Sequence, residues 1–198
     1  MKLNENTVIY GRGLTLIPYC KEHVPKYHNW MEDEEIQKTT ATEPQTLEEE
    51  YENQSMWLKD EDKLMFIIAE GRAVENPEQQ IQSMIGDVNL IYNEEEKEGE
   101  INVMIGEPSA RRKGLAIEAI KIMLTYAYDR MPLKRVFAKI GDDNEPSIRL
   151  FKNKLNFLEE SYCSPFKEFT FALENDELEK FMSSISRDTY EVQKKQAD

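Results

Sequence analysis

Glu100–Leu124 reads EINVMIGEPSARRKGLAIEAIKIML and is the most informative stretch of the 198-residue sequence. Apolar and other side chains alternate over Glu100–Ile105, which predicts a strand whose two sets of side chains face opposite ways. Apolar residues then recur at spacings of three and four, which predicts a long amphipathic helix from Lys113 to about Arg130. Between strand and helix lie three consecutive basic residues, 111–113, followed directly by Gly114.

The turn before this helix has the composition of a phosphate-binding site. Backbone N–H groups at the start of a helix lack partners and carry partial positive charge, so a diphosphate there gains hydrogen bonds and a favourable dipole interaction. Gly114 and Ala116 leave room for close approach. The side chains of Arg111, Arg112 and Lys113 can add charge-assisted hydrogen bonds. A basic patch before a helix is also commonly ordinary surface, so composition alone leaves both interpretations open.

The rest of the chain predicts a mixed order of strand, two helices, three strands, helix, strand, helix and two strands. The other expected strands are Thr7–Ile17, which Gly11 and Gly13 interrupt and can divide into two, Leu64–Glu70, Ser83–Tyr92, Arg135–Ile140, Phe157–Tyr162 and Phe166–Leu173. The other expected helices are Glu22–Glu32, Thr46–Lys59 and Pro146–Lys154. The second of them begins with a capping box, Thr46 to Glu49. The polar stretch Val74–Gln82 predicts a hairpin loop.

Length and composition predict one domain, residues 1–173, followed by a polar segment, residues 174–198. This segment carries a thin apolar stripe at helical spacing, formed by Leu178, Phe181, Met182 and Ile185. It therefore either docks as a helix or is a mobile tail. Because the stripe is narrow and the last strand precedes it, we expect a chain ending near residue 175 to fold without it.

The net charge of −14 argues against nucleic-acid binding, because a protein that binds phosphates along a polymer needs the attraction of a basic patch. No apolar run reaches the roughly 20 residues that span a bilayer, and the N-terminal residues lack the apolar run of a signal peptide. We therefore expect a soluble, cytoplasmic protein with no membrane partner. The cysteines, Cys20 and Cys163, are far apart, and the histidines, His23 and His28, stand alone, so we expect free thiols and no metal site.

The basic turn resembles a known signature. Its sequence matches the Arg/Gln-x-x-Gly-x-Gly/Ala motif of the Gcn5-related N-acetyltransferase superfamily, between the fourth strand and the following helix. In that superfamily this loop, here Arg111, Arg112, Lys113, Gly114, Leu115 and Ala116, binds the pyrophosphate of coenzyme A. The resemblance implies an α+β fold. Its central sheet is mostly antiparallel and twisted, splayed between strands 4 and 5, with helices on both faces.

Two further likenesses narrow the assignment. Asn144–Arg149, with Asn156-Phe157 after it, is similar to a segment of the branch that includes the bacterial ribosomal-protein N-terminal acetyltransferases. Leu14–Tyr19 and Tyr27–Met31 resemble the eukaryotic N-acetyltransferase 9-like proteins, and this likeness extends to about Leu173. The resemblance implies that His23 and His28 are packing residues rather than catalytic residues.

The resemblance implies an enzyme that transfers the acetyl group of acetyl-CoA directly to an amine in a ternary complex, without a metal. The acceptor is expected to be an N-terminal or lysine amine of a protein or peptide, and a small-molecule amine is a rival. Because the pantetheine arm enters between strands 4 and 5 in this superfamily, we expect the backbone at Val103, Met104 and Ile105 to bind it and to stabilise the oxyanion. Asn144 is expected to contact the coenzyme.

Two residues are candidates for proton transfer. Glu100 either takes the proton of the acceptor amine, directly or through water, or is an exposed charge at the end of its strand. Ser147 either donates a hydrogen bond to the thiol of the coenzyme or satisfies the first turn of its helix. Phe151 stands where many members of the superfamily have a tyrosine that protonates the leaving thiolate. It therefore supports a rival interpretation, a catalytically weak or inactive adaptor of the same fold that acts through protein binding.

Overall fold

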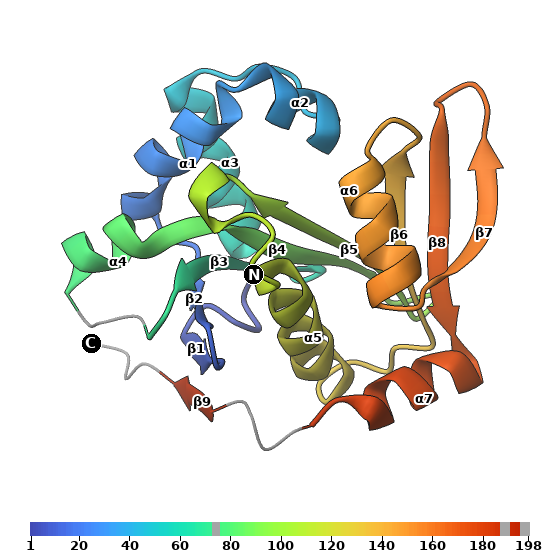
Figure 1. The fold of residues 1–198 in the computed structure, drawn as a ribbon. Coiled ribbons are helices and arrows are strands. Elements are labelled where there is room, and N and C mark those ends of the chain that lie inside the picture. Colours follow the sequence, from blue (N-terminus) through green and yellow to red (C-terminus); the bar gives the residue numbers. More distant parts are fainter. Residues whose placement is uncertain (73–75, 187–190, 195–198) are drawn as a thin grey trace.

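A nine-stranded sheet organises the chain in the computed structural model, which describes residues 1–72, 76–186 and 191–194. The strands lie in the order β7-β8-β6-β5-β4-β3-β2-β1-β9, and every neighbouring pair is antiparallel except β5 and β6. In Figure 1 the strands β6, β8 and β7 stand steeply against β3, β4 and β5, so the sheet is strongly twisted. The predicted α+β fold with a mostly antiparallel, twisted sheet is confirmed.

The elements follow the predicted order closely. The strands are β1 Thr7–Tyr10, β2 Leu14–Pro18, β3 Lys63–Glu70, β4 Met84–Asn93, β5 Glu98–Ile105, β6 Arg135–Gly141, β7 Leu158–Cys163, β8 Glu168–Glu174 and β9 Glu191–Lys194. The helices are α1 Val24–Met31, α2 Glu34–Thr40, α3 Leu47–Lys59, α4 Pro77–Ser83, α5 Leu115–Tyr128, α6 Glu145–Ile148 and α7 Asn175–Ser184. Short 3₁₀ turns lie at Lys21–His23 and Pro108–Ala110, and a π-helical turn at Arg149–Lys154.

Two separate cores cover the two faces of the sheet. Alternation along β5 sends Ile101 into the core under α5 and α7, and sends Met104 into a core shared with α1 and α3. Figure 1 shows α5 and α7 in front of the sheet and α3 behind it. Helices therefore cover both faces, as predicted. No helix within the described ranges combines the length and the apolar character needed to cross a membrane.

The only parallel pair among the described strands opens along its length. The β5–β6 ladder joins Glu98 to Arg135, Gly99 to Val136 and Glu100 to Phe137. Beyond these pairs β5 continues to Ile105 and β6 to Gly141, but the two strands no longer pair with each other. Since β5 and β6 are the fourth and fifth strands expected from the sequence, the splay between them is confirmed.

Two local features differ from the predictions. The stretch expected as a hairpin loop contains α4, capped by Asn76 with Pro77 in its first turn, while its residues 74 and 75 lie outside the described part. The short helix α2 was not predicted, although Asp33 caps its first turn by accepting from Glu35 N at 2.8 Å and Ile36 N at 3.2 Å. Both helices bury few apolar residues, so they have almost no stripe for a sequence pattern to detect.

The C-terminal segment docks on the fold. α7 buries Leu178 and Met182, and Ile185 follows directly, with exposed fractions of 2%, 3% and 6% within the α5 core. β9 then pairs with β1, from Thr7 with Lys194 to Tyr10 with Glu191. Of the two alternatives left by the sequence, the docked helix is therefore correct. The expectation that a chain ending near residue 175 folds unaided conflicts with this burial.

Met182→Ala is expected to destabilise the protein by about 2–4 kcal/mol, because truncating a buried methionine removes apolar contacts and leaves a cavity. Ser183→Ala, in the exposed next position of α7, is the matched control and should change stability by less than about 0.5 kcal/mol. Urea unfolding of the full chain measures both values. Equal stabilities for the two variants would show that α7 contributes nothing to the core.

Candidate active site

The turn between β5 and α5 is built around left-handed backbone. Arg112 has φ +63° and Gly114 has φ +82°, and the second of these positions forms the N-cap of α5, which begins at Leu115. Left-handed conformations are strained for residues with a Cβ, so Gly114 ends the turn and lets the helix start without cost. This conformation also explains why α5 begins two residues later than the Lys113 start predicted from its stripe.

The three basic residues of the turn have different surroundings. Arg111 Nε donates to the backbone oxygen of Ile105 at 3.1 Å, which folds the side chain over the end of β5. Lys113 Nζ pairs with Glu70 Oε1 at 2.8 Å, at the end of β3. Within the described residues the side chain of Arg112 makes neither a hydrogen bond nor an ion pair, and it is exposed. Arg112 is therefore the basic side chain best able to reach a bound phosphate.

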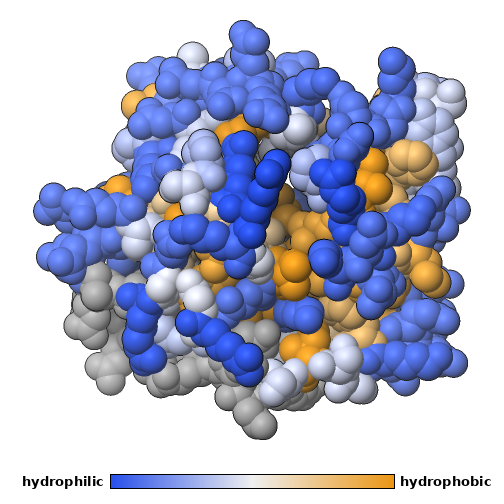
Figure 2. Space-filling model, viewed as in Figure 1, coloured by the Kyte–Doolittle hydropathy of each residue, from blue (hydrophilic) through white to orange (hydrophobic). Residues whose placement is uncertain are grey.

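The start of α5 fits a diphosphate. Glu118 N bonds back to Gly114 O at 3.2 Å, so the N–H groups of the helix turn before it, including those of Leu115 and Ala116, precede the first such bond. A Cβ built on Gly114 would meet no atom within 4 Å, so the space in front of these donors is open. A cavity of about 400 Å³ adjoins it, lined by Arg12, Gly114, Ile117, Glu118, Lys121 and residues 184–186. Figure 2 shows an apolar hollow between strongly hydrophilic side chains over the region between α5 and α6.

The free edge of β5 lies at the splay. Val103, Met104 and Ile105 pair with Val88, Asp87 and Gly86 of β4 on one side. Alternate backbone groups of a strand point to its other side, and there β6 has already diverged. A Cβ on Gly86 would lie 1.9 Å from Met104 O, so glycine is needed for β4 to approach β5 this closely. Within the described residues no strand covers this edge beyond Glu100, so it is open to an extended ligand apart from Ile105 O, which accepts from Arg111.

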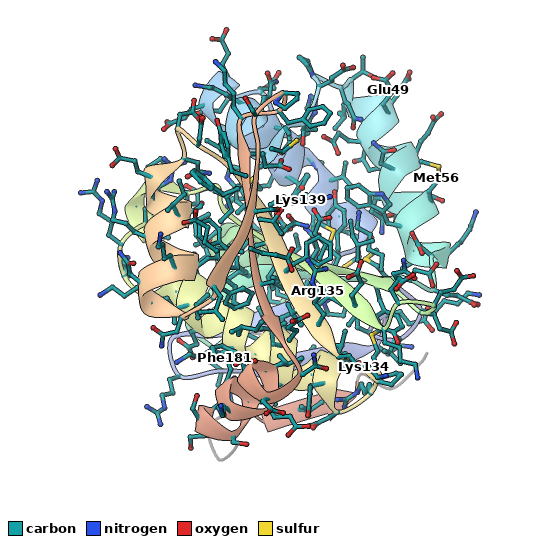
Figure 3. All side chains as sticks on the ribbon, turned by 90° about the vertical axis from the view of Figure 1, so that its right-hand side faces the viewer. Glu49, Met56, Lys134, Arg135, Lys139 and Phe181 are labelled. Atoms are coloured by element: carbon teal, nitrogen blue, oxygen red, sulfur yellow. The ribbon has the colours of Figure 1, made fainter. Side chains whose placement is uncertain are left out.

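Glu100 lies where the splay begins. It occupies the last β5–β6 pair, opposite Phe137, and its Oε2 is 3.3 Å from Lys139 Nζ of β6. Its side chain is about a quarter exposed, at 26%. In Figure 3, Lys139 and Arg135 lie on the side of the sheet that faces α3, away from α5 and α6. Glu100 is thus a solvent-accessible carboxylate on the face opposite the phosphate turn, with a lysine beside it.

Asn144, Ser147 and Phe151 lie on the segment after β6. Asn144 Oδ1 accepts from Ser147 N at 3.2 Å and so caps α6, leaving its amide nitrogen for other contacts. The half-buried Ser147 hydroxyl makes no hydrogen bond within the described residues. Phe151 is only 3% exposed and packs edge-on against Phe157 at 5.2 Å between ring centroids. Asn156 has φ +57°, the left-handed conformation that an asparagine tolerates in place of glycine.

The two histidines lie in α1 and the 3₁₀ turn before it. His23 is 2% exposed, and its Nδ1 accepts from Cys20 N at 3.2 Å, which fixes the 3₁₀ turn. His28 Nε2 lies 4.0 Å from Glu32 on the same helix. Each therefore has a local structural contact. No group of three or more potential metal ligands occurs in the part of the chain that the structure describes.

A row of hydrogen-bonded polar side chains, which the sequence did not predict, lies on the face of the sheet opposite α5. Asp87 on β4 is 2% exposed, and its Oδ2 accepts from Asn89 Nδ2 at 3.0 Å. Asn89 Oδ1 in turn accepts from Asn102 Nδ2 of β5 at 3.4 Å. Burial raises the pKa of Asp87 to about 6, against the smaller opposing effects of the Asn89 hydrogen bond and of Lys63. Asp87 and Asn89 share one face of β4 because they are two residues apart, but only the pairing register brings Asn102 to them, so no local motif marks the set.

Asp87→Asn is expected to stabilise the protein near pH 7. Because the folded-state pKa is raised, the folded state binds more protons than the unfolded state between about pH 4 and 6, and stability falls as pH rises through that window. The isosteric amide removes this cost, which amounts to on the order of 2 kcal/mol for a shift of about two units. Unfolding of wild type and variant at about pH 4 and pH 7 should show equal stabilities at the lower pH and a more stable variant at the higher. A variant that is less stable at both values would contradict the assignment of Asp87 as a buried, costly charge.

Comparisons with known proteins agree with this geometry. Residues 13–154 match the sequence model of the acetyltransferase (GNAT) domain. The chain is 46% identical to an N-acetyltransferase 9-like protein of Dictyostelium discoideum, with 89% of each chain covered. It is 46% identical to the human alpha/beta-tubulin-N-acetyltransferase 9, with 90% of this chain and 88% of the relative covered. Spermidine N-acetyltransferase from Vibrio cholerae, solved with CoA and spermine, has a TM-score of 0.72 at 19% identity, covering 84% of this chain and 98% of that one.

Proposed function

The chain belongs to the GNAT family of acetyltransferases, and on this premise we propose that its acceptor is an amine of α/β-tubulin. It is an acetyl-CoA-dependent N-acetyltransferase. The observation that carries the proposed acceptor is the identity of 46% to the human relative and 44% to the mouse relative, both of which are named for tubulin acetylation. A protein acceptor also suits the exposed rim of the splay, where Phe166 in the β7–β8 turn is 80% exposed.

The residues of the turn would hold the acetyl donor. Backbone N–H groups from Gly114 to Ala116 and the side chain of Arg112 would receive its diphosphate at the start of α5. The free edge of β5 at Val103–Ile105 would bind the pantetheine arm as an added strand, and an N–H group there would stabilise the oxyanion that forms at the thioester carbonyl. This arrangement leaves the opposite face of the splay for the acceptor.

Two side chains, those of Glu100 and Ser147, would take part in proton transfer and in stabilising the leaving thiolate. Glu100 faces the acceptor side and would take the proton that the amine loses as it attacks, directly or through one water. Phe151 is buried and cannot donate a proton, so the leaving thiolate would receive a hydrogen bond from the Ser147 hydroxyl, with water supplying the proton. Asn144 would contact the coenzyme through the amide nitrogen that α6 does not use.

Transfer of labelled acetyl from acetyl-CoA to purified αβ-tubulin tests the proposal, with mass spectrometry locating the acetylated amine and with spermidine as a competing small amine. The proposal expects label on a tubulin amine that excess spermidine does not abolish. Label on spermidine or on unrelated peptides, and none on tubulin, would overturn the acceptor while leaving the enzyme class intact. Coenzyme binding without transfer to any amine would favour the adaptor interpretation.

A further inference from the structure

The chain of hydrogen bonds from Asp87 through Asn89 to Asn102 ends at the splay. Asn89 and Asn102 are directly opposite each other in the β4–β5 ladder, and Asp87 lies two residues along β4, opposite Met104. Asn102 comes two residues after Glu100, the last residue of β5 that pairs with β6. Its half-buried side chain therefore lies at the edge of the opening, on the acceptor side of the sheet, together with that of Glu100.

The buried carboxylate fixes the direction of both amides. An ionised carboxylate only accepts hydrogen bonds, so Asn89 must turn its NH₂ group toward Asp87 and its oxygen toward β5. Asn102 then donates its NH₂ group to that oxygen. The remaining atom, Asn102 Oδ1, is left as an acceptor at the opening. A hydrogen-bond acceptor in a fixed position is what an incoming amine needs in order to direct one N–H away and its lone pair toward the thioester.

The surroundings of Asp87 indicate that its charge does not stabilise the fold and therefore serves the function of the protein. Lys63 on β3 acts on the charge of Asp87, but its ammonium lies over the Trp57 ring at 3.7 Å, and among the described residues it forms no ion pair with Asp87. Tyr19, after β2, and Tyr27, on α1, lie close enough for the Asp87 charge to act on them: burial is the main cause of the raised pKa of both tyrosines, and Asp87 adds to it. Glu50 of α3, also buried, lies near both tyrosines. A buried carboxylate without an ion pair is costly, and such cost is typical of functional sites.

We propose that Asn102 holds the acceptor amine in the splay through its Oδ1, and that Asn89 and Asp87 are positioning residues that fix its orientation. The proposal rests on the proposed approach of the amine to the acceptor side of β5, and it deepens that function by naming the group that orients the amine. It applies to any primary amine that the enzyme accepts, so it does not depend on tubulin being the acceptor.

Asn102→Ala is expected to lower kcat/KM for the acceptor by about 10- to 100-fold, because the amine loses its oriented contact. The affinity for acetyl-CoA, measured by calorimetry, should stay within about twofold of wild type, since the phosphate turn and the β5 backbone are unchanged. Asn93→Ala is the matched control, because Asn93 is the last residue of β4 and lies outside the Asp87–Asn89–Asn102 set. It should leave both quantities unchanged. The assay uses the peptide or small amine that wild type acetylates fastest in the competition experiment above.

Asp87→Asn separates positioning from mere structural support. The ratio of wild-type to variant kcat/KM should be close to one at low pH, where the protonated Asp87 of wild type is neutral like the asparagine of the variant, and should rise to about tenfold above about pH 6. A ratio that does not change with pH, or an Asn102→Ala enzyme with wild-type kcat/KM for the acceptor, would overturn the proposal. Wild-type transfer to other amines but not to tubulin would contradict only the proposed acceptor.

Discussion

Replacing Gly114 by leucine is expected to weaken acetyl-CoA binding by at least about tenfold. At φ +82° a residue with a Cβ is strained, and its side chain would extend into the open space in front of the helix N–H groups. A diphosphate could then no longer approach donors whose hydrogen bonds and partial charge hold it. Calorimetric titration with acetyl-CoA gives the affinity, and thermal unfolding gives the stability of the same sample.

Gly71 provides the matched control for this substitution. It also has a left-handed backbone, at φ +73°, and a Cβ there would meet no atom within 4 Å. Gly71→Leu should therefore impose comparable backbone strain, of about 1–2 kcal/mol, without touching the phosphate turn. Equal coenzyme affinity in the two variants would contradict the assignment of the diphosphate to the start of α5.

Glu100→Gln is expected to reduce kcat/KM by roughly 100-fold at low pH, where the acceptor is an ammonium ion and a general base must remove its proton. The loss should shrink at high pH, because the free amine is then abundant. Ser147→Ala should instead lower kcat by about 10- to 1000-fold across the whole range, since one aligned donor to the leaving thiolate is lost. The pH profiles of wild type and both variants on one accepted amine measure these effects.

The profiles also separate the two proton roles from simple binding. Lys139 forms an ion pair with Glu100, so Lys139→Met is a useful companion variant. It removes the charge beside the carboxylate while keeping the carboxylate itself, so it should keep the general base that Glu100→Gln removes and lose much less activity at low pH. Three superimposed profiles for wild type, Glu100→Gln and Ser147→Ala would refute both assignments and leave orientation as the contribution of the protein.

The sequence predicted the fold well because its strongest signals are local. The alternating strand before Gly114, the stripe of α5 and the capping box of Thr46 and Glu49 each depend on neighbours in the chain. α4 and α2 escaped detection because they are short and polar, so that only their caps mark them. The π-helical turn Arg149–Lys154 was expected as regular helix, since apolar spacing does not distinguish the two.

The candidate site was predictable only in part. The phosphate turn is a contiguous motif, and its glycine, its basic residues and the helix after it can be read together. The Asp87–Asn89–Asn102 chain depends instead on the register of β4 with β5, which no single strand encodes. Docking of α7 was equally hard to predict, because three buried residues in a polar segment are compatible with either a docked helix or a tail.

A crystal structure of the protein with bound coenzyme A tests the account most directly. The account predicts that the diphosphate contacts the backbone N–H groups of Gly114–Ala116 and that the pantetheine arm lies along the free edge of β5 at Val103–Ile105. The thiol should then end in the splay between β5 and β6, within reach of Ser147. A coenzyme bound elsewhere, for example in the cavity that Tyr128 and Met182 line between α5 and α7, would contradict it.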